Sequence, residues 1–130
     1  MNKSETGSVA WFDLTVPKAK QVSEFYSAVV GWKSQAVSMG EYDDYAMHTP
    51  DSNSGVAGVC HATGVNHDLP AQWMMYIKVD DLDASIAQVV KLGGRVLTPV
   101  KKLSDASHYA VIQDPAGAVC AVFDETGQDK

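Results

Sequence analysis

The sequence has little positive charge, no long apolar run and few cysteines, and each of these absences excludes a class of protein. The net charge of −6 disfavours a nucleic acid or an anionic membrane as a partner. No apolar stretch approaches the roughly 20 residues of a membrane span, and residues 1–12 lack the apolar region of a signal peptide. Cys60 and Cys120 have neither Cys-x-x-Cys spacing nor the density of a disulfide scaffold. We therefore expect a cytoplasmic protein with reduced thiols.

Several catalytic signatures are also missing. The chain has no Ser-His-Asp order, phosphate-binding loop or nucleotide-binding fingerprint. Its 130 residues suffice for one domain with a real core and leave little room for two. The sequence therefore predicts a single domain without a known catalytic motif.

Hydrophobic periodicity predicts a mixed α and β protein. Apolar residues at helical spacing predict two helices. The first ends at Gly31 and has the apolar stripe Val22, Phe25, Tyr26, Val29 and Val30; the second runs from Leu82 to Gly93. Asp114-Pro115-Ala116-Gly117 favours a tight turn between two strands near the C-terminus. Alternating or short apolar segments predict the strands Ser8–Val16, Trp32–Val37, Asp44–His48, Val56–His61, Trp73–Val79, Arg95–Leu103 (broken near Pro99), Ser107–Gln113 and Ala118–Phe123.

The pattern of elements occurs twice. Val16 corresponds to Val79 and Gly31 to Gly94, each 63 residues later, whereas Gly55 corresponds to Gly117 with a shift of 62. One such module exposes a sheet face that it cannot bury alone. We expect an α+β domain over residues 8–124, built from two βαβββ modules at about 8–61 and 73–124. We expect a half-open mixed sheet around a cleft, a linker at 62–72, a flexible N-terminus at 1–7 and a tail at 125–130.

These features together resemble the vicinal oxygen chelate superfamily, which includes glyoxalases, bleomycin resistance proteins and extradiol dioxygenases. The resemblance covers about residues 8–124. It rests on Phe25-Tyr26 followed by Gly31-Trp32, on Val79-Asp80-Asp81 before the second helix, and on Asp114-Pro115-x-Gly117. The chain is most similar to the short uncharacterised glyoxalase-related members. The resemblance implies a small-molecule ligand and a homodimer, but a shared fold does not fix the activity.

The metal site of the superfamily is not matched here. In metal-dependent members, two residues on each module, usually His or Glu, hold a divalent ion. The corresponding positions are Trp11, Met74, about Val59 and Ala121, none of which is a good ligand. His61 would serve only if the strand register were different. We therefore expect no metal and no other cofactor.

Alternation along the strands predicts which side chains face the cleft. Asp13 and Thr15 follow Trp11 on one face, and the matching strand offers Met74, Tyr76 and Lys78. An aromatic cleft with a few polar groups is typical of a small-molecule site. These residues also have a structural interpretation. Trp11 and Met74 would fill the space that a metal ion occupies in other members, and Asp13 would form a hydrogen-bonded bridge to Lys78 or Tyr76. The predicted ligand-binding set is Trp11, Asp13, Thr15, Val59, Met74, Tyr76, Lys78, Ala121 and Phe123.

The sequence therefore favours a metal-free protein that binds a small molecule. The alternative is a metal-independent isomerase, lyase or hydroxylase-like enzyme that uses Asp13 or His108 as a general base. His108 is a candidate because its strand can face the cleft. A further alternative is a metal-dependent glyoxalase or dioxygenase, which requires a different strand register. Cys60 and Cys120 are expected on the opposite strand faces from Val59 and Ala121, where they would pack against the helices.

Overall fold

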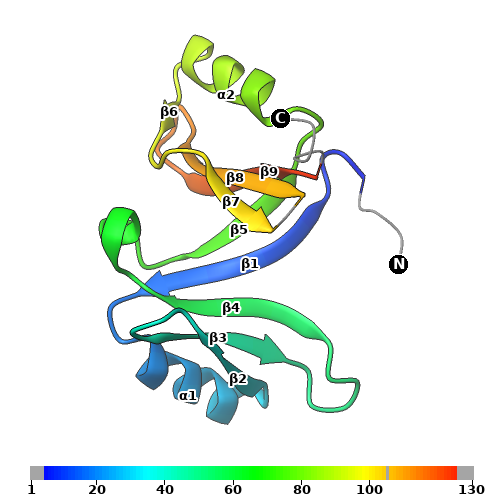
Figure 1. Cartoon of the computed structure of the whole chain (residues 1–130), viewed down its shortest axis with the longest axis vertical. Helices are drawn as coiled ribbons and strands as arrows, with labels where there is room; N and C mark the ends of the chain where they lie inside the picture. Colours follow the sequence, from blue (N-terminus) through cyan, green and yellow to red (C-terminus); the bar gives the residue numbers. More distant parts are fainter. Residues whose placement is uncertain (1–4, 105, 126–130) are drawn as a thin grey trace. The chain divides into compact units, whose positions relative to one another are not determined.

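The computed structural model describes residues 5–104 and 106–125, and it divides into two compact units. The N-terminal unit is Trp11–Trp73, and the C-terminal unit is Met74–Lys130 together with Met1–Ala10. Most of the predicted flexible N-terminus and tail lies outside the described residues. Each unit is described separately below (Figure 1).

The N-terminal unit is a βαβββ module. Its strand order is β2-β3-β4-β1, in which β1 and β4 run parallel and the other neighbours antiparallel. Gly31 ends the helix in a left-handed conformation with φ of 81°, which glycine adopts without strain. The elements are β1 (Val9–Val16, whose first two residues belong to the other unit), α1 (Ala19–Val30), β2 (Lys33–Ser38), β3 (Asp43–His48), β4 (Gly55–His61) and a 3₁₀ turn (Gly64–Asn66).

The C-terminal unit repeats this order of elements, except that two strands, β6 and β7, follow its helix before the last two strands. Its strand order is β5-β9-β8-β6, with β5 and β9 parallel, and β7 also pairs with β8. Pro99 lies between β6 and β7, where a residue without an N–H interrupts the ladder. The elements are β5 (Trp73–Lys78), α2 (Leu82–Lys91), β6 (Arg95–Val96), β7 (Lys101–Ser104), β8 (Ser107–Gln113) and β9 (Val119–Asp124).

The core of the N-terminal unit lies between its sheet and α1. Leu14, Val59 and Met47 point toward the helix, where Ala19 is fully buried. The predicted apolar stripe of α1 is only partly buried, because Phe25 and Val29 are 57% and 61% exposed. The helix therefore packs through a narrower face than its apolar residues indicate, and an apolar flank faces outward.

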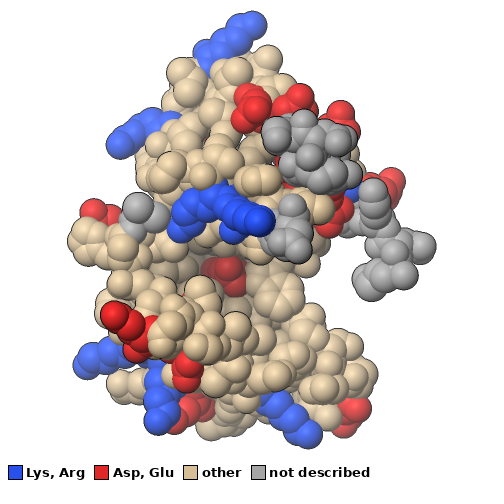
Figure 2. All heavy atoms as spheres, viewed as in Figure 1, with Lys and Arg blue, Asp and Glu red and all other residues tan. Residues whose placement is uncertain are grey.

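The α+β class and the predicted elements are confirmed with strand ends shifted by one or two residues, except that the predicted strand Arg95–Leu103 is two separate strands, β6 and β7, with residues 97–100 between them. Acidic and basic side chains are interspersed on the face seen in Figure 2, with uncharged areas between them. Among the described residues, neither helix has the length and hydrophobicity required to cross a bilayer.

Candidate functional site

The centre of the candidate site is a hydrogen-bonded pair on β1. The indole Nε1–H of Trp11 donates to Oδ1 of Asp13 over 2.7 Å, and both side chains are half-buried. The two residues share a face because they are two positions apart on a strand. The bond fixes the carboxylate and the edge of the indole ring relative to each other, as a binding site requires.

Gly58 on β4 forms the floor beneath this pair. Asp13 and Gly58 are neighbours in the parallel β1–β4 register. A Cβ atom at position 58 would collide with the Asp13 carboxylate and would lie 3.4 Å from Trp11 Nε1. The absence of a side chain at this position therefore allows the Asp13 carboxylate to lie over the backbone of β4.

The prediction of which β4 side chains lie on the same face as Trp11 and Asp13 is wrong by one residue. Val59 is the register neighbour of Leu14 and is fully buried in the core beneath α1, so it does not share a face with Trp11 and Asp13. Cys60 is the neighbour of Thr15 and therefore lies on the Asp13 side of the sheet. The expectation that Cys60 packs toward the helix is wrong for the same reason. Thr15 itself is buried, at 5% exposed.

The thiol of Cys60 lies near two carboxylates. Burial raises the pKa of Cys60 well above its usual range, and the negative charges of Asp13 and Asp44 and a hydrogen bond to Asp44 raise it further. Asp44 also accepts the backbone N–H of His61 over 2.8 Å. Because the thiolate is the reactive form, the raised pKa makes the Cys60 thiol less reactive than an exposed thiol.

Asp44 and His48 on β3 are site residues that the sequence analysis missed. Ala46 on the same strand is the register neighbour of Gly58, which places Asp44, two residues away, on the Asp13 side. A Cβ built at Gly55 would lie 3.5 Å from His48 Nε2 and 3.7 Å from Trp11 Cη2. Imidazole and indole therefore both lie over Gly55. No sequence signal identified these two residues, because the pairing with β4 determines which side chains of β3 lie on the same face as Asp13.

We call this surface, on the opposite side of the N-terminal sheet from α1, the Trp11 face. It has acceptor groups, an indole ring, an imidazole and a floor of small residues. Its members are Trp11, Asp13, Thr15, Asp44, Ala46, His48, Gly58 and Cys60.

The predicted residues of the C-terminal unit also share one face of their own sheet. Tyr76 is the register neighbour of Ala121, and Lys78 is the neighbour of Phe123. The Tyr76 ring lies 5.6 Å from that of Tyr109, which the sequence analysis did not include. Lys78 Nζ lies 3.2 Å from Glu125 Oε1. Met74, Tyr76, Ala121 and Phe123 are buried, and their predicted role in ligand binding stays a prediction.

His108 lies on the other face of the C-terminal sheet. Its neighbour is Asp124, one residue beyond Phe123, so the expectation that it shares the face of Tyr76 is wrong. His108 lines a separate cavity of about 80 Å³ with Leu82, Asp83, Val100 and Asp124. Asp124 accepts the N–H of Leu82, the first residue of α2, over 3.0 Å.

The register also tests the fit of a metal ion to the four family positions. Asp13 is paired with Gly58, and Tyr76 is paired with Ala121, so the last strands of the two modules match with a shift of 63. The position expected at Val59 is therefore Gly58, and the set contains no His, Cys, Asp or Glu ligand. Within residues 5–104 and 106–125, no three such side chains are placed to hold a metal. The donor set does not fit a divalent ion.

Comparison with known proteins identifies the family. A family model described as "Glyoxalase-like domain" matches residues 10–123. The chain is 30% identical over 134 residues to the anthracycline biosynthesis protein DnrV of Streptomyces peucetius. The aligned region covers 95% of this chain and 49% of that protein. It is 30% identical over 126 residues to the putative glyoxylase CFP32 of Mycobacterium tuberculosis, covering 90% of this chain and 45% of that protein. The chain thus spans about half the length of these relatives.

A solved structure supports the fold. The chain resembles methylmalonyl-CoA epimerase in complex with methylmalonyl-CoA and NH4+, with a TM-score of 0.60 and 14% identity over 93% of this chain and 96% of that chain. At this level of identity the likeness concerns the fold alone.

Proposed function

Because this chain belongs to the glyoxalase-like domain family, we propose that it binds a small, partly aromatic organic molecule on the Trp11 face without a metal ion. The observation that carries the proposal is the Trp11–Asp13 hydrogen bond over Gly58. A fixed indole ring offers a stacking surface, and a fixed carboxylate offers an acceptor for a ligand hydroxyl or amine.

The relatives support a small molecule as the ligand. The epimerase structure that shares the fold contains a CoA ester, and DnrV is named for the biosynthesis of a small molecule. We carry over only the size class of these ligands, because a shared fold hosts many functions. The cytoplasmic location stays a prediction.

The experiment is a ligand screen read by tryptophan fluorescence. The panel contains aromatic compounds that bear hydroxyl or amino groups, and each hit is repeated with Trp11→Phe. Trp32→Phe is the matched control, because Trp32 lies in a separate aromatic cluster with Tyr26 and Trp73. We expect the quenching to disappear in Trp11→Phe and to persist in Trp32→Phe. Quenching that survives in Trp11→Phe would place the ligand elsewhere.

Asp13 tests the polar part of the site. A hydrogen bond between the ligand and a charged group contributes about 1.5–3 kcal/mol, so Asp13→Asn is expected to raise the Kd about 10- to 150-fold. Asp51→Asn, in an exposed loop, is the charge-matched control. Equal effects of the two variants would exclude Asp13 from the ligand contacts.

A second candidate is metal-independent proton transfer by Asp13. It is favoured by the carboxylate being held in one orientation by the indole N–H, as a general base must be held. Turnover of any bound compound, lost in Asp13→Asn with binding retained, would support this function over sequestration. His108 belongs to a different face of a different unit, so His108→Gln is expected to leave such turnover unchanged.

A further inference from the structure

One flank of α1 is an apolar surface that faces solvent. Phe25, Val29 and Val30 are each more than half exposed. Phe25 and Val29 are four residues apart, so they lie on the same side of the helix. Ala19 and Ser23 are buried and face the sheet instead. The described part of the chain therefore leaves this apolar flank of α1 open to solvent.

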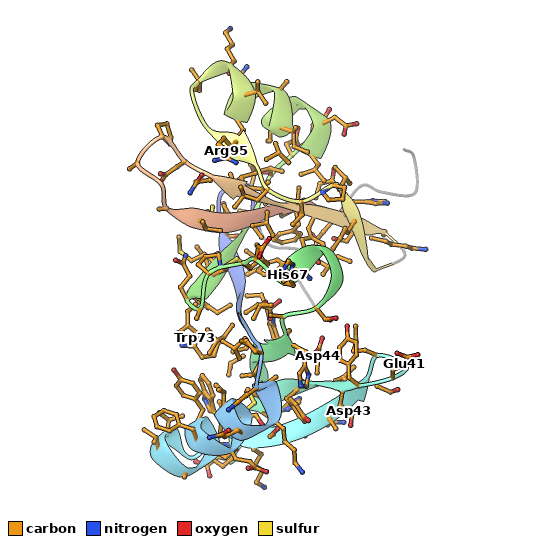
Figure 3. The ribbon with its side chains drawn as sticks, turned by 90° about the vertical axis from the view of Figure 1, so that its left-hand side faces the viewer. Glu41, Asp43, Asp44, His67, Trp73 and Arg95 are labelled. Carbon is orange, nitrogen blue, oxygen red and sulfur yellow. The ribbon has the colours of Figure 1, made fainter. Side chains whose placement is uncertain are left out.

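Three aromatic rings that carry polar groups adjoin the flank. The ring centroid of Tyr26 lies 5.1 Å from that of Phe25 and 5.3 Å from that of Trp73. The indole Nε1–H of Trp73 donates to the Tyr26 hydroxyl over 3.2 Å, which holds Trp73 beside α1 (Figure 3). Trp32 completes the cluster, with its ring centroid 6.0 Å from that of Trp73. Tyr and Trp favour the boundary between lipid and water, because each combines an apolar ring with a polar group.

Exposed lysines lie at both ends of the flank. Lys18 immediately precedes α1, and Lys33 follows the helix at the start of β2. Residues 17–33 contain three lysines and one glutamate, although the whole chain has a net charge of −6. The flank is therefore locally basic in an acidic protein.

The nearest group of acidic residues on the sheet lies away from the aromatic cluster. Figure 3 shows Glu41, Asp43 and Asp44 near the turn between β2 and β3, on the other side of the N-terminal unit from Trp73. Salt screens exposed charges over about 8 Å at physiological ionic strength. A charged surface that contacts the flank therefore interacts mainly with the lysines of the flank.

The composition of the flank favours a lipid surface over a protein partner. Protein interfaces are depleted in lysine. At a bilayer, by contrast, the lysine stem lies along the apolar boundary while the ammonium group reaches the headgroups. An apolar helix flank with basic residues and aromatic rings beside it is typical of a helix that lies in the membrane interface.

We propose that the α1 flank docks this protein on the surface of an anionic lipid bilayer. The helix lies parallel to the surface, with Phe25 and Val29 at the boundary of the acyl chains and Lys18 and Lys33 beside anionic headgroups. The Trp11 face is on the opposite side of the N-terminal sheet from α1. The docking therefore leaves that face open and does not depend on its ligand.

The test is co-sedimentation with vesicles of phosphatidylcholine mixed with phosphatidylserine, compared with vesicles of phosphatidylcholine alone. We expect tighter binding to the mixed vesicles, weakened by high salt. Lys18 makes no capping hydrogen bond with its side chain, so Lys18→Gln is expected to preserve the helix and to weaken binding about fivefold. Lys91→Gln, at the end of α2, is the charge-matched control and is expected to bind like the wild type.

The double variant Phe25→Ala/Val29→Ala tests the apolar part of the contact. Both side chains are exposed, so we expect wild-type stability in urea and a loss of about tenfold in affinity for the mixed vesicles. Leu92→Ala is the matched control, because Leu92 is 67% exposed at the end of the other helix.

Three results would overturn the proposal. The first is an absence of binding to the mixed vesicles at low salt. The second is binding that Lys18→Gln and Phe25→Ala/Val29→Ala leave unchanged, because the lipid then contacts another surface. The third is self-association without vesicle binding that Phe25→Ala/Val29→Ala abolishes, which would assign the flank to a protein contact.

Discussion

Gly58→Ala is the sharpest test of the geometry of the Trp11 face. A Cβ atom at this position would collide with the Asp13 carboxylate, which has to rotate away and so loses the hydrogen bond from Trp11. A hydrogen bond to a charged group contributes about 1.5–3 kcal/mol. Alanine in a strand restores about 0.5–1 kcal/mol relative to glycine through the unfolded state. We therefore expect a net loss of about 1–2 kcal/mol in the free energy of unfolding.

The assay is urea denaturation followed by tryptophan emission. With a denaturant slope of about 2 kcal/mol/M, the expected loss lowers the midpoint by about 0.5–1 M. The emission of Trp11 should also change, because its indole N–H loses its hydrogen-bond acceptor.

A double-mutant cycle separates the collision from other effects. In an Asp13→Ala background the Cβ at position 58 meets no carboxylate, so Gly58→Ala should be neutral or slightly stabilising. A Gly58→Ala protein with wild-type stability and emission would refute the placement of Asp13 over Gly58. An equal loss in both backgrounds would show that position 58 is crowded by something other than Asp13.

Three further predictions follow from the same structure. The raised pKa of Cys60 means that the folded state holds this proton more tightly than the unfolded state, whose thiol ionises near pH 8.5. The stabilisation from holding this proton is therefore fully present below about pH 8.5 and is lost progressively as the pH rises above it. Between pH 8 and 10, the free energy of unfolding should fall less in Cys60→Ala than in the wild type. An equal fall in both proteins would contradict the burial of this thiol. Asp124→Ala removes the buried acceptor of the Leu82 N–H and should destabilise the protein by about 1–3 kcal/mol, whereas exposed Asp83→Ala should cost under about 1 kcal/mol; thermal unfolding measures both. Elemental analysis of untagged protein purified without chelator should find metal only at trace level, and a ratio near one ion per chain would contradict the metal-free site.

Local patterns in the sequence determined the elements and the two modules. The alternation of β1 placed Trp11 and Asp13 on one face because side chains on a strand point alternately to opposite sides. The end of α1 at Gly31 and the break in the strand at Pro99 could be predicted. Glycine adopts a left-handed backbone conformation without strain, and proline has a fixed φ angle and no N–H. These features depend on a few neighbouring residues, so the sequence alone contains them.

Pairing between distant segments decided the rest of the site. The shift of 62 between Gly55 and Gly117 placed Val59 on the wrong face. The strand pairing gives a shift of 63 instead, because Asp13 pairs with Gly58 and Tyr76 pairs with Ala121. A slip of one residue moves every side chain of a strand to the opposite face.

The same reason explains the residues that were missed or misplaced. The pairing of β3 with β4 places Asp44 and His48 on the Trp11 face. The pairing of β8 with β9 places His108 on the opposite face from Tyr76. Sequence periodicity fixes which residues of a strand lie together. Only the tertiary structure decides which of the two sets meets the helix and which remains available for a ligand, because that choice depends on the register with the neighbouring strand.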